Sequence, residues 1–431
     1  MDGQTVSLGK FRFKVNSRVG RFAMALAIVF ALTLLTTHAV EAQTFSVLHN
    51  FSGEDGEFPY AGVTVGPGGV LYGTAAAGGT HGYGTVFRLT HIGSSWVVGP
   101  LYEFTGGSDG ANPEGGVVIG PSSALYGTTT FGGVNYGIVF ELRPPATFCR
   151  AILCYWSEIV LHTFTGPDGE YPEFENLAFD QAGDIYGTTW KAGTYAGGTA
   201  FELTPSDGGY TESTLHSFGS GDGLWPAAGV VLDTAGNVYG TTSWGGIDTF
   251  GTVYQLVPSR GGWLENVLVN FDGPNGEGPL GNLIIDASGN LYGTTSGGGE
   301  RNGDSVVFKL APSEGGFTYS ALYSFGPYCD SDGGVAMDAA GNFFGVCSGG
   351  GAHQDGWIFE LTNCSETCIA NDLHDFSGSD GASPYGGPVL DANDNLYGTT
   401  QYGGNAAIMG GSCYPYGCGV VWEIAGAGSR P

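Results

Sequence analysis

Basic residues are scarce in this sequence, and charged residues of any kind are few. Lys and Arg number 13 against 41 Asp and Glu, and the four types together make up only 13 % of the 431 residues. The resulting formal charge of −28 repels nucleic acid and anionic lipid. The composition therefore argues against a nucleic-acid partner and suits a soluble protein outside the cell.

Motifs of several common enzyme classes are absent as well. The sequence has no H-E-x-x-H, no P-loop and no dinucleotide fingerprint. A match to G-x-S-x-G at 106–110 lies in a glycine-rich turn without a strand-to-helix context, so it does not indicate a serine hydrolase. The 80 glycines follow no G-X-Y period, which excludes collagen, and hydrophobic residues that recur in phase argue against disorder.

The first 42 residues differ from the rest. An apolar run, Phe22 to Val40, is followed by Val40-Glu41-Ala42, which has small residues where a signal peptidase cleaves. The run is preceded by a basic lead, namely Lys10, Arg12, Lys14, Arg18 and Arg21. We interpret 1–42 as a secretory signal peptide, which predicts a secreted, extracellular or periplasmic protein with no membrane span after cleavage. The alternative is an uncleaved anchor, because the run could just span a bilayer.

The eight cysteines fall into four pairs that are close in sequence. An even number of cysteines in an exported chain predicts disulfides. Zinc binding is the less favoured alternative, because no C-x-x-C is present and no histidine accompanies the pairs at ligand spacing. The expected disulfides are Cys149–Cys154, Cys329–Cys347, Cys364–Cys368 and Cys413–Cys418.

The motif L-Y-G-T-T organises the remaining chain, because it recurs about every 53 residues. Its tyrosines are Tyr72, Tyr126, Tyr186, Tyr239, Tyr292 and Tyr397, and Phe344 takes the same place in a seventh, degenerate copy. One unit contains four predicted strands, which in the fourth copy are 228–233, 238–243, 251–256 and 263–271. Four short strands per unit of this length are typical of a β-propeller. The sequence therefore predicts an all-β, seven-bladed β-propeller with four antiparallel strands per blade.

The two ends of the repeat region complement each other. The last unit stops after its third strand, 419–424, while a spare fourth strand, 48–51, precedes the first unit. We predict that these strands pair and complete the seventh blade, which removes two free sheet edges. The predicted single domain, 43–431, then contains the repeats 52–104, 105–164, 165–218, 219–271, 272–325, 326–376, and 377–424 with 45–51.

The repeat also resembles a known family. The succession Y-G-T-T-x-x-G-G, G-T-V-F-x-L, L-Y-S-F, D-G-x-x-P and D-x-x-G-N-L-Y-G-T-T is similar to the GloVer tandem repeat of bacterial exported proteins. This resemblance covers essentially the whole chain after the signal segment. It implies a secreted, propeller-like repeat protein and carries no established activity with it. Members often have a C-terminal anchor, and this chain ends without a hydrophobic tail.

Two loops of each unit are expected on one face of the propeller, and they carry the candidate ligand-binding residues. The D-G-x-x-P loops supply carboxylates, for which we name Asp55, Asp109, Asp168, Asp222, Asp332 and Asp380. The glycine-rich loops after Y-G-T-T supply aromatic rings, namely Phe131, Trp190, Trp244 and Tyr402. Stacking on these rings would bind carbohydrate, and the carboxylates could bind Ca²⁺. The competing interpretation is that Asp-Gly and Pro simply build the turn in every blade.

The hypothesis favoured by the sequence is a monomeric binding module for carbohydrate or a surface protein. A carbohydrate-active lyase or hydrolase is the first alternative, and it requires two acids that break the repeat and face each other across the channel. Its candidate acids are Glu57, Glu114, Glu170, Glu173, Glu175 and Glu277. A structural adhesion protein is the second alternative. The histidines His49, His162, His216 and His374 recur at one repeat position, which favours a structural role.

Overall fold

The computed structural model describes residues 43–146, 155–174, 176–299, 305–326, 328–364, 368–404, 413 and 415–428, together with the backbone of two short strands near the N-terminus. Those strands, β1 (Thr5–Leu8) and β2 (Phe11–Lys14), form a two-stranded antiparallel sheet. They belong to a separate unit from Thr44–Gly428. The rest of the predicted signal segment lies outside the described residues.

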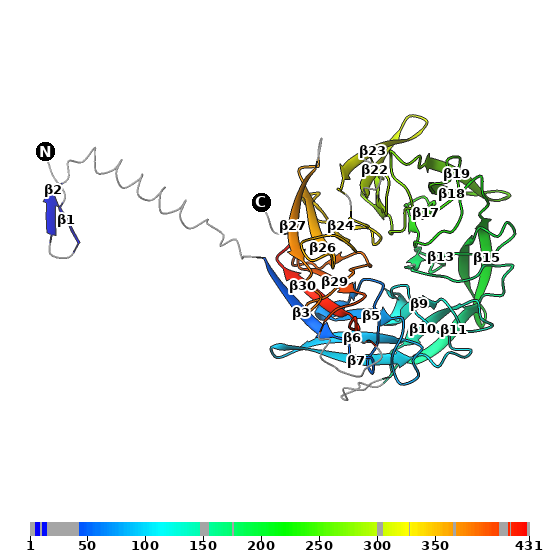
Figure 1. Cartoon of the computed structure of the whole chain (residues 1–431), viewed down its shortest axis with the longest axis horizontal. Helices are drawn as coiled ribbons and strands as arrows, with labels where there is room; N and C mark the ends of the chain where they lie inside the picture. The colour runs from blue at the N-terminus through cyan, green and yellow to red at the C-terminus, as the bar shows by residue number, and fades with distance from the viewer. Residues whose placement is uncertain are drawn as a thin grey trace. The chain divides into compact units, whose positions relative to one another are not determined.

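Residues Thr44–Gly428 form seven four-stranded antiparallel sheets within the described ranges, arranged around a central axis (Figure 1). The innermost strands are β4 (Thr64–Val65), β8 (Val118–Ile119), β12 (Ala178–Phe179), β16 (Val231–Leu232), β20 (Ile284–Ile285), β24 (Val335–Met337) and β28 (Val389–Leu390). The second strands carry Y-G-T-T and are β5 (Leu71–Ala75), β9 (Leu125–Thr129), β13 (Ile185–Thr189), β17 (Val238–Thr242), β21 (Leu291–Thr295), β25 (Phe343–Cys347) and β29 (Leu396–Thr400).

The third strands are β6 (Thr85–Ile92), β10 (Ile138–Arg143), β14 (Thr199–Ser206), β18 (Thr252–Ser259), β22 (Val306–Ser313), β26 (Trp357–Thr362) and β30 (Val420–Ala425). The outer strands are β7 (Ser95–Glu103), β11 (Ser157–Thr163), β15 (Gly209–Ser217), β19 (Gly262–Asn270), β23 (Gly316–Ser324), β27 (Ile369–Asp375) and, for blade seven, β3 (Thr44–Asn50). Two 3₁₀ turns, η1 (Pro67–Gly69) and η2 (Pro121–Ser123), connect strands in blades one and two. The seven-bladed propeller is confirmed.

The predicted closure of the ring is confirmed. Strand β3 pairs antiparallel with β30, with Thr44 opposite Ala425 and Asn50 opposite Val420, and it completes the sheet β28-β29-β30-β3. The first strand of the propeller is therefore the outer strand of its last blade. Thr399 Oγ1 on β29 also donates a hydrogen bond of 2.8 Å to the carbonyl of Ala61 in blade one.

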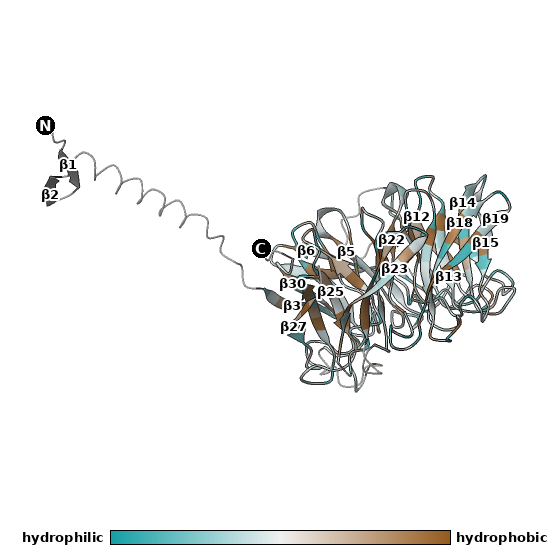
Figure 2. Cartoon of the chain, turned by 90° about the horizontal axis from the view of Figure 1, so that it is seen from above, coloured by the Kyte–Doolittle hydropathy of each residue, from teal (hydrophilic) through white to brown (hydrophobic). Residues whose placement is uncertain are grey.

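Side-chain packing within and between the blades explains the Y-G-T-T motif. In blade two, a Cβ on Gly127 would lie 2.8 Å from the ring of Phe140 on the neighbouring strand, so the aromatic ring occupies the space that glycine leaves. The tyrosines pack between blades, as expected, because Tyr126 contacts Phe179 and Tyr292 contacts Phe343 of the following blade. Brown segments inside the sheets in Figure 2 mark the hydrophobic strands of this core.

The innermost strands are shorter than the sequence predicted. The expected strand 228–233 is reduced to Val231–Leu232, and the corresponding strands of the other blades contain two or three residues. The residues just before this strand form hydrogen bonds with neighbouring blades instead of with their own sheet. The carbonyl of Ala228 accepts a hydrogen bond from Thr188 Oγ1, and the amide of Gly229 donates to Asn282 Oδ1. The chain beside the axis therefore connects blades to one another.

Three of the four predicted disulfides are confirmed, namely Cys329–Cys347, Cys364–Cys368 and Cys413–Cys418. The fourth predicted pair, Cys149 and Cys154, lies outside the described residues. No helix in the described part of the chain is long and apolar enough to cross a membrane.

Candidate functional site

Two sets of loops meet on one face of the propeller, as the sequence predicted. We call the loop from an outer strand to the next innermost strand the radial loop, the loop between second and third strands the hairpin loop, and the face that carries both the loop face. Isolated β-bridges join the two loops in six blades. The bridges are Glu57 with Ala77, Ala111 with Phe131, Glu170 with Lys191, Leu224 with Trp244, Glu277 with Gly297, and Ala382 with Tyr402.

The turn aspartates have their carboxylates occupied by their own loops. In blade one, Asp55 accepts hydrogen bonds from the amide of Ser52 at 2.8 Å and from its hydroxyl at 2.9 Å, while its second oxygen lies 2.8 Å from His49 Nε2. Burial raises the pKa of Asp55, but the hydrogen bonds and charge of His49 and the contacts with Ser52 outweigh it and lower the pKa. These contacts are what a turn-building residue makes.

The same arrangement recurs around the ring. The histidine–aspartate pairs are His162–Asp168 at 2.9 Å, His216–Asp222 at 2.9 Å and His374–Asp380 at 3.1 Å, and in blade two Tyr102 donates to Asp109. Each pair belongs to one radial loop and the outer strand before it. The structure thus distributes these aspartates one per blade and does not bring them together.

Asp332 does not belong to this set, and its assignment is corrected. Its radial loop lacks D-G-x-x-P and is held by the Cys329–Cys347 disulfide instead. Asp332 lies four residues before Ala336, the residue that pairs with Phe344. The residue in the same register is Tyr60 in blade one and Tyr385 in blade seven. We call this register the axial position.

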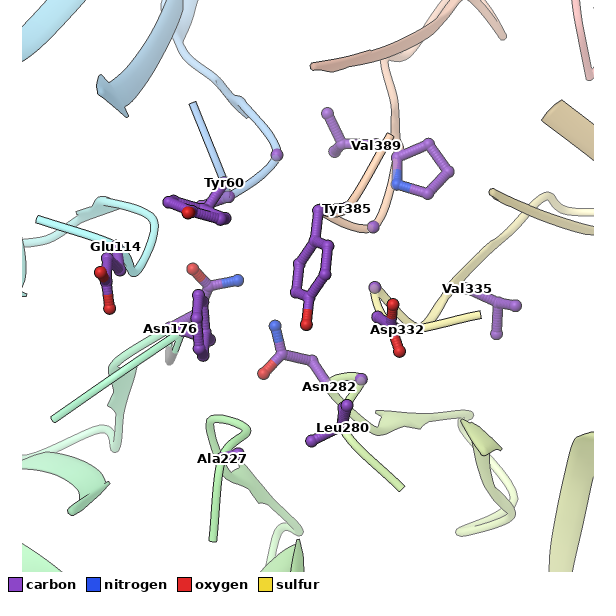
Figure 3. A pocket seen from close by; sticks show the side chains of 18 of the residues that line it. Tyr60, Glu114, Asn176, Ala227, Leu280, Asn282, Asp332, Val335, Tyr385 and Val389 are labelled. Atoms are coloured by element: carbon purple, nitrogen blue, oxygen red, sulfur yellow. The ribbon is translucent and has the colours of Figure 1, made fainter. Parts of the chain in front are cut away.

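The axial positions line a cavity of about 590 Å³ around the propeller axis. By strand register they are occupied by Tyr60, Glu114, Phe174, Ala227, Leu280, Asp332 and Tyr385. Figure 3 shows Glu114 and Asp332 on opposite sides of the cavity, with Tyr385 between Tyr60 and Asp332. Asn176 and Asn282 also project into it. We call this the axial pocket.

Three aromatic rings from different blades meet in the axial pocket. The ring centroids of Tyr60 and Phe174 are 5.5 Å apart, those of Tyr60 and Tyr385 5.8 Å, and those of Phe174 and Tyr385 5.7 Å. These are ordinary edge-to-face and tilted contacts. Blades one, three and seven thus join their rings across the axis and give the pocket an apolar aromatic wall.

The carboxyl groups of the axial pocket have raised pKa values. Burial raises the pKa of Asp332 to about 6, with a contribution from nearby Asp330, and the residue is only 9 % exposed. Burial also raises the pKa of Glu173 to about 7, helped by the charge of Glu114, and raises the pKa of Glu114 itself. Raised values follow because a low-dielectric pocket disfavours the charged form. Asp332 and Glu173 can therefore exchange protons near neutral pH.

A row of tryptophans leads from the loop face into the pocket. Trp190 and Trp225 line the pocket with ring centroids 5.8 Å apart. Trp225 stacks in turn on Trp244, at 6.2 Å with 29° between the planes, and Trp244 is 46 % exposed. We call these three side chains the tryptophan row. Outside it, Phe131 packs on Tyr171, and Tyr402 packs on Phe58, each across a blade boundary.

The backbone that carries Trp225 is held in a left-handed conformation, with φ of 61°. Such a conformation costs a non-glycine residue on the order of 1–3 kcal/mol and persists only when the surroundings enforce it. Here the amide of Trp225 donates to Gly197 of blade three, and its carbonyl accepts from Ser243 of blade four. Hydrogen bonds to two blades therefore fix the position of this ring.

The remaining predicted acids divide into two groups. Glu57, Glu170 and Glu277 lie in the β-bridges between loops and do not line the axial pocket. Glu114 and Glu173 do line it, whereas Glu175 lies outside the described residues. Sequence reasoning missed the pocket residues Tyr60, Tyr385, Asn176, Asn282 and Trp225. The available indication was the variation directly after the motif proline, where Tyr60, Glu114 and Tyr385 replace one another.

Comparisons with known proteins address the family and the fold. The chain matches the family model described as Gloeobacter/Verrucomicrobia repeat over residues 25–155 and 155–340. No curated protein matches it. Among solved structures, it is similar to the extracellular domain of a putative one component system from B. thetaiotaomicron, with 12 % identity and a TM-score of 0.53. That match covers 84 % of this chain and 39 % of the other.

A second similar structure is a putative 6-phosphogluconolactonase from Bacteroides uniformis, with 13 % identity and a TM-score of 0.47. The match covers 73 % of this chain and 84 % of that one. At such identities the likeness to solved structures concerns the fold alone, so the site must be interpreted from its own residues.

Proposed function

We propose that this chain, which belongs to the Gloeobacter/Verrucomicrobia repeat family, is a secreted binding module that holds a carbohydrate in its axial pocket. The observation that carries the proposal is the variety of side chains at the axial position. The motif positions of the repeat, such as Y-G-T-T, are nearly uniform because each blade needs the same packing. At the axial position, two tyrosines, a phenylalanine, a glutamate and an aspartate replace one another around one cavity.

The chemistry of the pocket suits a sugar. Aromatic faces stack on the apolar faces of pyranose rings, and amide and carboxyl groups hydrogen-bond hydroxyls. Trp190 and Trp225 supply the faces, while Asn176, Asn282 and Glu114 supply polar groups. The carboxyl groups disfavour an anionic ligand such as a uronate. A neutral oligosaccharide is therefore the ligand class that fits, and the tryptophan row gives a longer chain a path out of the pocket.

Thermal unfolding against a panel of neutral and acidic glycans, with and without Ca²⁺, tests the proposal. A ligand that binds only the folded protein raises Tm by mass action. We expect a neutral glycan to raise Tm and Trp190→Ala to weaken its Kd about tenfold, because one stacked ring contributes about 1.5 kcal/mol. Tyr195→Ala is the control, since Tyr195 is 69 % exposed and does not line the pocket. A panel without any shift contradicts the proposal.

A second candidate function is glycoside hydrolysis, favoured by the positions of Glu114 and Asp332. Both acids break the repeat pattern and stand on opposite sides of the axial pocket. In this reaction one acid protonates the leaving oxygen as the glycosidic C–O bond breaks, and the other, as a carboxylate, takes a proton from the water that adds at the anomeric carbon. If the protein is an enzyme, the wild type releases new reducing ends from the glycan. Glu114→Gln then loses this release but still binds the glycan, which distinguishes the enzyme from the binding module.

A further inference from the structure

One repeat position on the outer strands changes character between blades. It lies opposite the last leucine or isoleucine of the third-strand motif, as Glu212 lies opposite Leu203. In register, its occupants from blade one to blade seven are Val98, Glu158, Glu212, Glu265, Tyr319, Ala370 and Phe45. We call it the rim position. Val98, Ala370 and Phe45 pack against the hydrophobic core there.

The rim position faces the histidine–aspartate pair of the preceding blade. In blade seven, Phe45 stacks on His374 with ring centroids 3.5 Å apart and 5° between the planes. In blade three a glutamate takes this place. Ligand atoms of His162, Asp168 and Glu212 all lie within 4.8 Å of one another.

Blade four repeats the arrangement with His216, Asp222 and Glu265, again within 4.8 Å. The histidine comes from the outer strand of one blade, the aspartate from the radial loop, and the glutamate from the outer strand of the next blade. These two groups are the rim triads. Their histidines and aspartates are mostly buried, with side-chain exposures from 16 to 29 %.

A glutamate at the rim position is expected to make the folded state less stable than an apolar residue would. The blades that have Val, Ala or Phe there show that the position accepts an apolar side chain. Glu265 instead buries an oxygen, Oε1, that has no hydrogen-bond partner in the described structure. Glu158 of blade two, which faces no histidine, does the same, whereas Glu212 Oε1 accepts a hydrogen bond of 3.0 Å from Thr214 Oγ1. A buried acceptor without a partner destabilises the folded state, and more so when it is charged. At Glu265, a bound cation would supply the missing partner.

We propose that each rim triad binds a divalent transition-metal ion of the zinc class. One imidazole nitrogen and two carboxylate oxygens match the three protein ligands of an open zinc site, with solvent as the fourth ligand. Calcium is disfavoured because it takes oxygen ligands and has no use for the imidazole. His Nε2 and Asp Oδ2 are 2.9 Å apart in both triads. The ion takes the place of the hydrogen between them, so binding moves that proton to Nδ1 or to solvent.

The chain contains its own controls. His49–Asp55 faces Val98, and His374–Asp380 faces Phe45, so these pairs lack the third ligand. Recurrence of the histidine–aspartate pair indicates a structural role in all four blades. The glutamate accompanies it in only two, and this non-uniform residue carries the proposal.

Zinc titration by calorimetry on the tag-free, chelator-treated full chain tests the proposal, with elemental analysis after dialysis. We expect two zinc ions per chain, one in Glu212→Val, one in Glu265→Val and none in the double variant. Valine is the matched substitution because blade one has it at the same position. Val98→Glu should add a third ion by completing a triad with His49 and Asp55. Ca²⁺ should give no comparable heat.

Zinc absent from the wild-type chain, or a stoichiometry unchanged in the double variant, overturns the proposal. Thermal unfolding of each metal-free variant checks that it is folded. If the glutamate variants do not fold, the zinc stoichiometry of the wild type and of Val98→Glu decides. A third ion in Val98→Glu supports the triad as the binding site, and the absence of a third ion refutes the proposal.

Discussion

At the residue scale, the axial pocket buries Asp332 at a place where its negative charge does not stabilise the folded protein. Asp332 is nearly buried, and its pKa rises from 3.8 to about 6. The folded protein then binds this proton more tightly than the unfolded chain does. The contribution of Asp332 to stability is therefore fully present below about pH 4 and is lost as pH rises through 6, since the folded state must ionise a buried group.

We predict that Asp332→Asn raises the free energy of unfolding at pH 7 by about 3 kcal/mol at most, because a two-unit shift corresponds to that energy. The gain should vanish near pH 4, where Asp332 is protonated in the folded state. Chemical unfolding at several pH values measures it. Asp207→Asn, at an exposed residue in the turn between β14 and β15, is the control. Equal gains at both pH values would contradict the assignment.

A second residue-scale prediction concerns the glycine of Y-G-T-T. Gly127→Ala should destabilise the protein by about 1–3 kcal/mol, because the new methyl group would overlap the ring of Phe140. Gly261→Ala is the matched control, since a Cβ there meets nothing within 4 Å, and its effect should be close to zero. Denaturant titration compares the two variants, and similar effects would refute the packing explanation of the motif.

Sequence reasoning succeeded at this scale wherever a residue's role is repeated. The turn role of Asp55, the packing of Tyr126 and the paired cysteines could all be inferred from spacing. It failed for Asp332, because the radial loop of blade six departs from the motif and only strand pairing reveals the register. The rim position was missed for a related reason, since its importance depends on which side chain the neighbouring blade presents.

At the element scale, blade six uses a disulfide where other blades use a proline turn. The Cys329–Cys347 bond closes a loop with a sequence separation of 18, compared with 4 for Cys364–Cys368. Longer loops lose more entropy on cross-linking. The cysteine pairs could be predicted from sequence, whereas the shortening of the innermost strands could not, because it depends on contacts with adjacent blades.

We predict that replacing Cys329 and Cys347 by alanine lowers the free energy of unfolding by about 3 kcal/mol, and that the same change at Cys364 and Cys368 lowers it by about 2 kcal/mol. Each double variant serves as the control for the other. Urea unfolding under oxidising conditions gives both values. A larger loss for Cys364 and Cys368 would contradict the loop-length argument.

At the scale of the whole molecule, the ring is closed by non-covalent strand pairing between its first and last blades. The complementary ends of the repeat region made this closure predictable. The axial pocket was not predictable in the same way, because Tyr60, Phe174 and Tyr385 meet only when blades one, three and seven surround one axis.

We predict that a chain starting at Ser52, without β3, loses cooperative unfolding or melts on the order of 10 °C lower than one starting at Gln43. The deletion exposes the edge of β30 and removes Phe45 and Val47 from the core. A synthetic peptide of residues 43–51 added in trans should restore part of the loss. Calorimetry measures each Tm. An unchanged Tm in the shorter chain would show that β3 does not hold the ring closed.

Pairing β3 with β30 also sets an order of events during synthesis. Strand β3 leaves the ribosome before any other strand of the propeller, yet its partner, Val420–Ala425, is made after all of the others. Until then the growing chain exposes β3 and the edge of its newest blade, both of which can pair with another chain. The seventh blade must therefore assemble last. A chain truncated before β30 keeps two unpaired strand edges that can pair with other chains.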